Sequence, residues 1–161
     1  MPSMTRRTLM VLMIASLSGC GRRRNRSRNR SQSGSGDTLP LYPNETPELR
    51  VLINKYAKIY DVPVALVHRQ IIRESTHRPS ARNGPYYGLM QILPQTARTM
   101  GYRGPDSGLL DAETNLKYAV KYLRGAWLLS DGSFDTAVKW YSRGYYYEAK
   151  RRGMLRETGL I

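Results

Sequence analysis

Signals for the start and end of helices recur along residues 41–161, and they constrain the fold more than any other feature of the sequence. Thr46 supplies a helix N-cap, Pro47 a first-turn proline, and Glu48 an acid at the positive end of the helix dipole. We therefore expect a helix that runs to about residue 60. By the same signals, further helices are expected to begin at Pro63, Pro94, Asp111, Ser133 and Tyr145.

The helix that begins at Asp111 is expected to lie at the centre of the core. Its apolar residues keep a helical spacing on one face: Leu116, Val120, Leu123 and Trp127. Only Tyr86–Leu93, which follows Asn83-Gly84-Pro85, favours strands, and we expect a small β-hairpin or an irregular loop there. The sequence thus predicts a mainly α domain over residues 41–161, long enough to bury a single core.

Residues 1–19 have the pattern of a signal peptide, because Arg6 and Arg7 precede the apolar run Leu9–Leu17. As a helix this run would rise only ~15 Å, about half of the ~30 Å hydrocarbon core, so a permanent membrane span is not expected. The order Leu17-Ser18-Gly19-Cys20 resembles the bacterial lipobox, which implies lipidation of Cys20 after cleavage. The alternative is an ordinary secreted protein with an incidental cysteine.

Residues 20–40 are expected to form a disordered tether, because arginine, serine and asparagine dominate them and nearly all lack a side chain suited to a core. The arginines either lie near anionic headgroups and wall polymer or serve as a soluble spacer. We expect a lipid-anchored protein at the periplasmic face of a bacterial membrane. Gly21 gives no acidic retention signal, which favours the outer membrane.

The formal net charge of +14 is compatible with nucleic acid, an anionic membrane or an acidic polymer as partner. A secretion signal leaves no nucleic acid to bind. One cysteine cannot close an internal disulfide, and one cysteine with two histidines falls short of the four ligands of a structural zinc site. We expect a monomer without metal or cofactor.

Glu74 stands out because a carboxylate continues the apolar helical series Val64, Val67 and Ile71. A charged group at the edge of an apolar face costs desolvation free energy unless a partner offsets it. On helix geometry alone, the favoured interpretation is a rim carboxylate paired with Arg73 or Arg78. The alternative is a functional acid.

Three ordered motifs favour the functional interpretation. They are Glu74-Ser75, then Gly88-Leu89-Met90-Gln91 with Pro94-Gln95-Thr96-Ala97, and finally Trp140-Tyr141-Ser142-Arg143-Gly144. Together they resemble the bacterial lytic transglycosylases of the soluble-transglycosylase type, over residues from about 48 to 150. The resemblance implies a lysozyme-like helical fold whose small β-hairpin or loop region flanks a cleft.

The resemblance also implies the chemistry. Glu74 would act as the single acid and base that cleaves the β-1,4 bond between N-acetylmuramic acid and N-acetylglucosamine, with formation of 1,6-anhydromuramyl products. Ser75 and Tyr141 would orient Glu74 or the N-acetyl group, Gln91 would present its amide to a sugar, and Met90 would form apolar wall. Flat faces for sugar rings could come from Tyr86, Tyr87 and the run Tyr145, Tyr146 and Tyr147. His77 would fill the family's aromatic position.

Two alternatives remain open from the sequence. A true muramidase of the same fold would need a second acid, such as Asp106, to activate water. A non-catalytic peptidoglycan-binding module would explain why Ser142 stands where the family has asparagine, since a hydroxyl reaches less far than an amide. In each case the expected partners are peptidoglycan glycan strands, the membrane through the lipid anchor, and cell-wall machinery.

Overall fold

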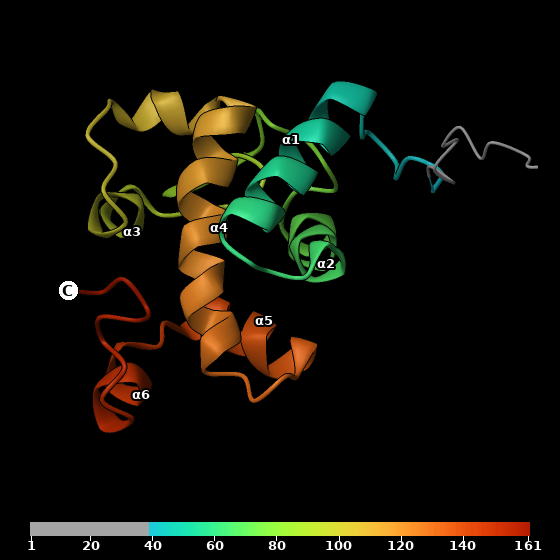
Figure 1. Ribbon diagram of the computed structural model, residues 1–161. Coiled ribbons are helices and arrows are strands. Elements are labelled where there is room, and N and C mark those ends of the chain that lie inside the picture. The colour runs from blue at the N-terminus through green and yellow to red at the C-terminus, as the bar shows by residue number, and fades with distance from the viewer. Residues whose placement is uncertain (1–38) are drawn as a thin grey trace, which may run out of the picture. The chain divides into compact units, whose positions relative to one another are not determined.

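The structure is a computed structural model that describes residues 39–161 (Figure 1). The signal peptide predicted for residues 1–19, the lipidation of Cys20 and nearly all of the tether lie outside the described residues. Within residues 39–161, no helix combines the length and the apolar character that crossing a bilayer requires.

Residues 39–161 form a mainly helical domain with one small hairpin, as the sequence predicts. The elements are α1 (Pro47–Ile59), α2 (Val64–Glu74), β1 (Arg82–Asn83), β2 (Tyr86–Tyr87), α3 (Pro94–Thr99), the 3-10 helix η1 (Asp106–Leu110), α4 (Ala112–Leu128), α5 (Phe134–Arg143) and α6 (Tyr146–Arg151). β1 and β2 are antiparallel, with Arg82 opposite Tyr87 and Asn83 opposite Tyr86. The sequence signals did not indicate η1.

Three of the predicted helix starts carry the expected side-chain caps. The side-chain oxygens of Thr46, Asp111 and Ser133 accept hydrogen bonds from the backbone N–H three residues later, at 3.2, 2.8 and 3.2 Å. Such a bond satisfies one of the backbone N–H groups that a helix start leaves unpaired. The boundaries of α1, α4 and α5 are therefore local properties of the sequence.

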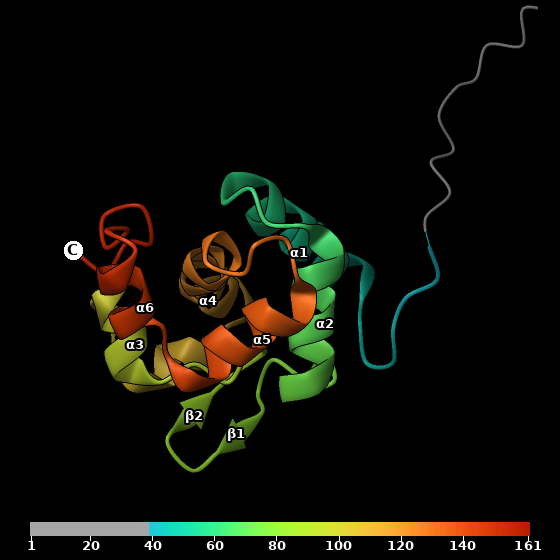
Figure 2. The ribbon, with the colours of Figure 1, turned by 90° about the horizontal axis from the view of Figure 1, so that it is seen from below.

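Helix α4 is central, as its apolar spacing predicts, and the other elements surround it (Figures 1 and 2). It packs against α1, α3, α5 and η1. Leu116, Val120 and Leu123 are fully buried on its inward faces, and the partly buried Trp127 makes an edge contact with Phe134. This core fixes where the ends of α2 and α5 lie.

The predicted buried face of α2 is wrong at Val64, which is 42% exposed. Val64 lies in the first turn of α2 and lines an open surface hollow, so it extends past the core. The buried face instead includes Val67 and Ile71 together with Gln70. Glu74 follows Gln70 by one helical turn, so the carboxylate lies directly beyond a buried amide.

A segment before α1, residues 39–46, packs over α2 and the turn that follows it; we call it the strap. Glu45 in the strap forms two 2.6 Å hydrogen bonds with Arg50 and lies 3.9 Å from His68. The imidazoles of His68 and His77 are hydrogen-bonded at 3.1 Å, and the ring of Tyr42 stacks on His77. The strap therefore covers a pair of buried histidines.

This cluster makes the fold sensitive to acid. Burial lowers the pKa of His68 to about 4, although the charge of Glu45 opposes the shift. Burial would raise the pKa of Glu45, but hydrogen bonds from Arg50 and from the backbone N–H of Tyr42 outweigh it and lower that pKa. Both groups bind fewer protons in the folded protein than in the unfolded chain.

We predict that the free energy of unfolding falls as the pH drops from about 6.5 towards 4. In this range the unfolded chain protonates its histidines while the folded protein keeps His68 neutral, a difference of roughly 2–3 kcal/mol for this group. Urea denaturation at a series of pH values measures the change. The slope should be smaller in His68→Gln, and an equal slope in the variant would contradict the assignment.

Candidate active site

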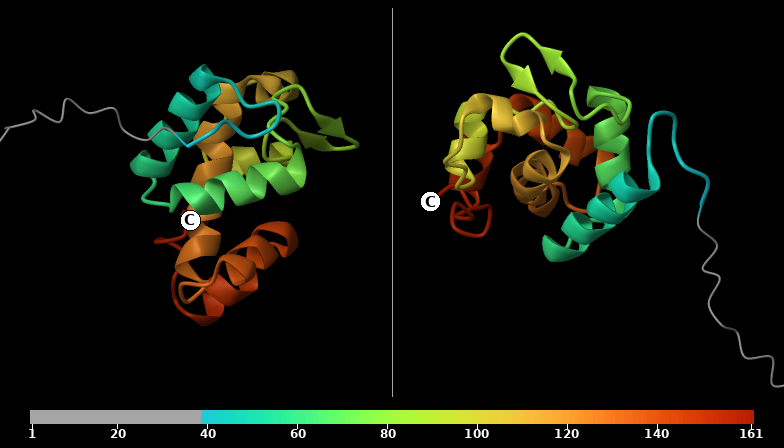
Figure 3. Two further views of the ribbon diagram at one scale, coloured as in Figure 1. Left: turned by 90° about the vertical axis from the view of Figure 1, so that its right-hand side faces the viewer. Right: turned by 90° about the horizontal axis from the view of Figure 1, so that it is seen from above.

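Glu74 lies at the C-terminal end of α2, on the wall of a cavity of about 500 Å³. The cavity is bounded by the end of α2, the hairpin, the start of α3, the middle of α4 and the end of α5, and Figures 2 and 3 show these elements converging near the hairpin. Among residues 39–161, Glu74 is the only carboxylate in its lining, which comprises Arg73, Glu74, Asn83, Tyr86, Gln91, Ile92, Leu93, Thr96, Tyr122, Tyr141, Ser142, Arg143 and Gly144.

The Glu74 carboxyl group is partly shielded from water and lightly paired. Its side chain is 22% exposed, and its Oε1 accepts a 2.8 Å hydrogen bond from Nε2 of Gln70. Nε of Arg73 lies 3.6 Å from the same oxygen. Burial raises the pKa of Glu74, and the positive charge of Arg73 opposes the shift. The raised pKa favours the protonated form of the carboxyl group.

The pairing expected on helix geometry is therefore present with Arg73 and absent with Arg78. The guanidinium of Arg78 donates to the backbone carbonyl of Ser75 at 2.9 Å. Arg73 is itself 58% exposed, so solvent weakens its hold on the carboxylate. Gln70 was missed by the sequence reasoning, although its position one turn before Glu74 was a usable signal.

The loop that faces Glu74 is fixed by Asn115 of α4, which is fully buried. Its amide Nδ2 donates to the carbonyls of Tyr87 and Leu109, each at 2.8 Å, and its Oδ1 accepts from the N–H of Met90 at 3.0 Å. Gly88 turns the chain at φ +73°, and a Cβ there would lie 2.4 Å from the carbonyl oxygen of Leu109. Any larger residue at this position would collide with the backbone.

Tyr141 of α5 lines the cavity and closes its inner end. Its hydroxyl donates to the carbonyl of Met90 at 2.9 Å, and its ring meets Tyr122 edge-on. Burial raises the pKa of Tyr141 well above its ordinary value, and the charge of Glu74 adds to the shift. Tyr141 is thus a neutral wall residue near Glu74, in the place that the sequence comparison suggested.

Gln91 also lines the cavity, but its amide nitrogen is used within the protein. It donates to the carbonyls of Ala81 and Gly88 at 3.0 and 2.8 Å. Both N–H bonds therefore brace the hairpin and the turn that follows it, so the expectation that Gln91 presents its amide to a sugar stays a prediction for the carboxamide oxygen alone. Its carboxamide oxygen is the remaining polar atom of the side chain.

Three other predicted site residues lie outside the cavity lining. The Ser75 hydroxyl donates to the carbonyl of Leu89 at 2.7 Å, so it joins α2 to the loop without contacting the Glu74 carboxylate. Met90 is fully buried in the core and does not form the predicted wall. Side chains alternate across the hairpin, so Tyr87 turns inward and the exposed Tyr86 lines the cavity instead.

Ser142 lies at the rim, at the end of α5, and is exposed. Its hydroxyl donates to the carbonyl of Val138 at 3.0 Å, within the helix. Tyr145 is core, since it is 1% exposed and its hydroxyl donates to the Tyr122 carbonyl at 2.9 Å. Tyr146 and Tyr147 are exposed but do not line the cavity. They therefore offer no sugar platform next to Glu74.

The structure offers no second acid beside Glu74 among residues 39–161. Asp106, the acid considered for a hydrolase, is ion-paired with Arg98 at 2.5 Å and is outside the cavity lining. Asp111 caps α4, and Glu113 pairs with Lys55 at 2.5 Å. The cavity therefore suits chemistry that runs on one carboxyl group.

The described residues contain one group with the donor set of a metal site, namely Glu45, His68 and His77, whose ligand atoms lie within 4.8 Å of one another. Both carboxylate oxygens of Glu45 are bound by Arg50, and the two imidazoles bond to each other. A cation would compete with a guanidinium for the same oxygens. None of the three residues lines the Glu74 cavity. His77 is buried, and its ring stacks on that of Tyr42.

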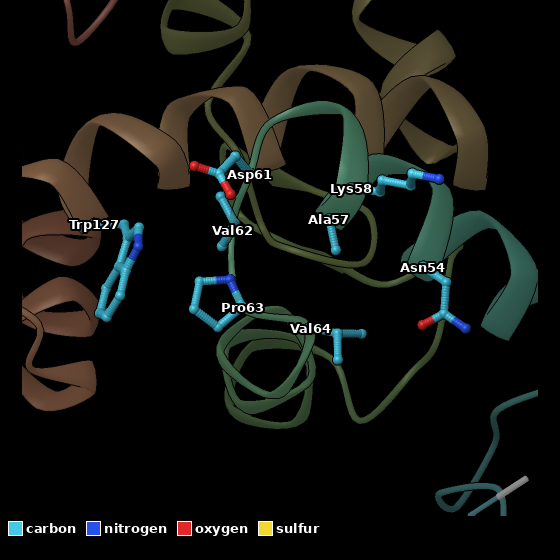
Figure 4. Close-up of a pocket in the computed structure, with 8 residues that line it drawn as sticks. All are labelled: Asn54, Ala57, Lys58, Asp61, Val62, Pro63, Val64 and Trp127. Carbon is cyan, nitrogen blue, oxygen red and sulfur yellow. The ribbon is translucent and has the colours of Figure 1, made fainter. Parts of the chain in front are cut away.

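Figure 4 shows a separate hollow between the end of α1, the start of α2 and Trp127 of α4. Asp61 is its only carboxylate and pairs with Arg124 at 3.4 Å. The side chains of Val62, Pro63 and Val64 make its floor largely apolar. It holds no buried acid of the kind found at Glu74, so the candidate site is the Glu74 cavity.

Comparison with known families shows the family of the chain. The Transglycosylase SLT domain matches residues 51–150, and the chain therefore belongs to this family. The family acts on peptidoglycan as lytic transglycosylases, and the mainly helical fold with a small antiparallel sheet is consistent with its lysozyme-like architecture. No solved structure matches the chain. The matched region includes Glu74, Gln91, Asn115 and Tyr141.

We predict that Asn115→Ala lowers the free energy of unfolding by about 3 kcal/mol, because three buried hydrogen bonds are lost at ~1 kcal/mol each. Urea denaturation measures the loss. Asn54→Ala, at an exposed position of α1, is the matched control and should change stability little. Hydrogen exchange at residues 88–92 should rise in Asn115→Ala, and unchanged protection would show that the side chain does not hold this loop.

Proposed function

We propose that this protein cleaves the β-1,4 bond between N-acetylmuramic acid and N-acetylglucosamine in peptidoglycan and releases 1,6-anhydromuramyl ends. Glu74 acts first as acid and then as base. The observation that carries the proposal is a single, half-buried carboxyl group on the wall of a cavity of about 500 Å³, in a chain of the SLT family.

The first step needs a proton donor. Glu74 gives its proton to the glycosidic oxygen, the bond from that oxygen to the anomeric carbon breaks, and the substrate's N-acetyl oxygen bonds to that carbon. Burial of Glu74 supports this step because it raises the pKa and so favours the protonated form. Tyr141, which is buried and neutral, lines the same cavity as the acid.

The second step needs the same group as a base. The sugar's 6-hydroxyl loses its proton to the Glu74 carboxylate, and its oxygen displaces the N-acetyl oxygen to close the 1,6-anhydro ring. Water is not consumed, so no second carboxylate is required. The N–H of Gln70 and the charge of Arg73 stabilise the carboxylate formed between the two steps.

We also propose that the domain works at the periplasmic face of a bacterial membrane, held by a lipid on Cys20. This part rests on the sequence pattern of residues 1–20. A chain of twenty residues after Cys20 reaches at most roughly 65–70 Å when fully extended. An anchored domain could therefore act on glycan strands well away from the lipid surface.

We predict that Glu74→Gln lowers the rate of peptidoglycan cleavage by about 10³-fold or more, because the isosteric amide can neither donate nor accept the proton. Mass spectrometry of the wild-type digest should show anhydromuramyl ends, one water lighter than hydrolysis products. Glu157→Gln, at an exposed position, is the matched control. Reducing ends alone would identify a muramidase, and an inert wild type that still binds wall would identify a binding module.

We predict that Gln70→Met moves the alkaline limb of the pH–rate profile to higher pH. The first step requires protonated Glu74, so activity is present below its pKa and is lost as the pH rises through it. Removing the Gln70 N–H takes away a bond to the charged form and raises that pKa further. Gln95→Met, on the exposed surface of α3, is the control, and a shift of the limb to lower pH would contradict the role given to Gln70.

A further inference from the structure

The outward faces of α2 and α5 carry a second hollow of about 420 Å³ beside the Glu74 cavity. Four of its lining residues are basic, and we call them the cationic shelf: Arg69 and Arg73 of α2, and Lys139 and Arg143 of α5. All four are exposed. Val138 contributes apolar surface to the same hollow.

The cationic shelf is continuous with the candidate active site. Arg73, Ser142 and Arg143 line both hollows, so a ligand that fills the Glu74 cavity reaches the shelf at its rim. The left-hand view of Figure 3 shows α2 and α5 lying one above the other, with the hairpin beyond the C-terminal end of α2. The shelf extends from that end back along the two helices.

Positive charge exceeds negative charge on the shelf. Arg69 is paired with Asp135, and Arg73 lies beside Glu74. Among residues 39–161, Lys139 and Arg143 have no carboxylate oxygen within 4.0 Å. Asp135 is 82% exposed, so its pairing with Arg69 is readily exchanged for another carboxylate.

The substrate of the proposed function carries negative charge on groups attached beside the scissile bond. Its sugars are uncharged once the muramyl lactyl group is joined to a peptide, and the carboxylates lie on the peptide stems. A stem leaves the strand at the muramic acid, the sugar whose glycosidic bond is cleaved. Guanidinium and ammonium groups are the side chains that bind carboxylates by charge-assisted hydrogen bonds.

We propose that the cationic shelf binds the carboxylates of the peptide stem on the muramic acid that occupies the Glu74 cavity. This inference rests on the proposed function and gives it a substrate preference. Strands that carry stems bring the stem carboxylates to the shelf, whereas strands stripped of peptide keep only the lactyl carboxylate next to the sugar ring. The enzyme therefore favours peptide-bearing glycan over bare glycan.

The test compares two substrates and two double variants. Arg69→Gln with Lys139→Gln removes two shelf charges while leaving Arg73 and Arg143 at the cavity rim. Arg151→Gln with Lys150→Gln is the matched control, since Arg151 is exposed and ion-paired with Glu148 as Arg69 is with Asp135, and Lys150 is an exposed lysine on a helix. The substrates are peptide-bearing glycan strands and the same strands stripped by an amidase.

The measured quantity is the ratio of kcat/KM for peptide-bearing strands to kcat/KM for stripped strands. Loss of two exposed ionic contacts should lower this ratio about three- to tenfold, through a higher KM on the peptide-bearing strand. The control should keep the wild-type ratio. A ratio that stays at the wild-type value in the shelf variant, or that falls equally in the control, would overturn the proposal.

The outcome also separates this inference from the proposed function. A wild-type protein that cleaves both substrates with a ratio near one supports the proposed function and overturns the shelf. If the wild type cleaves neither substrate, the proposed function fails. The shelf is then decided by titrating fluorescent muramyl-peptide into the wild-type and shelf-variant proteins, and equal affinity would overturn it. Displacement by poly(glycerol phosphate) at lower concentration than by stem peptide would assign the shelf to a phosphate polymer instead and overturn the proposal.

Discussion

The side chain of Asn115 holds together the segments that form the candidate active site. Its three hydrogen bonds join α4 to the end of the hairpin, to the loop at Met90 and to η1. Ser75, the C-cap residue of α2, and Tyr141 of α5 donate to two further carbonyls of the same loop, those of Leu89 and Met90. Three helices therefore fix one short loop through side-chain bonds to its backbone, and the position of Glu74 relative to the cavity follows from this arrangement.

The proposed use of Glu74 as both acid and base depends on the electrostatic balance at this carboxyl group. Burial favours the protonated form, whereas Arg73 and the Gln70 amide favour the charged form. A deeper, unpaired acid would hold its proton too firmly, and an exposed acid with a close partner would lose it too early. The exposed guanidinium and the single amide bond place Glu74 between these two limits.

The sequence predicts the helical fold and the partly buried carboxylate at Glu74 well because both depend on local or strongly patterned signals. The caps at Thr46, Asp111 and Ser133 specify helix starts within a few residues of chain. Helical periodicity also places Glu74 beside an apolar face. Periodicity does not show how far along the helix the rest of the core extends. For this reason the sequence predicts that Val64 is buried, whereas it is exposed.

Residues in loops were predicted less well, because a motif identifies such residues without showing which way their side chains point. The backbone N–H and carbonyl of Met90 form hydrogen bonds with Asn115 and Tyr141, while its side chain is buried in the core. The amide nitrogen of Gln91 donates to two backbone carbonyls. The choice between Tyr86 and Tyr87 depends on the register of the hairpin. The cationic shelf draws on two helices separated by sixty residues of chain, so only packing reveals it.

The strap has a consequence for where the independently folding piece of this chain begins. The family match starts at residue 51, but Tyr42 and Glu45 cover the imidazoles of His68 and His77, and Asn44 donates to the carbonyl of Thr76 at 3.0 Å. A protein trimmed to the family boundary would leave the imidazole of His68 on α2 and that of His77 just after α2 uncovered. The segment that must be present for a fully packed domain is thus longer than the segment that the family match covers, and it begins before α1.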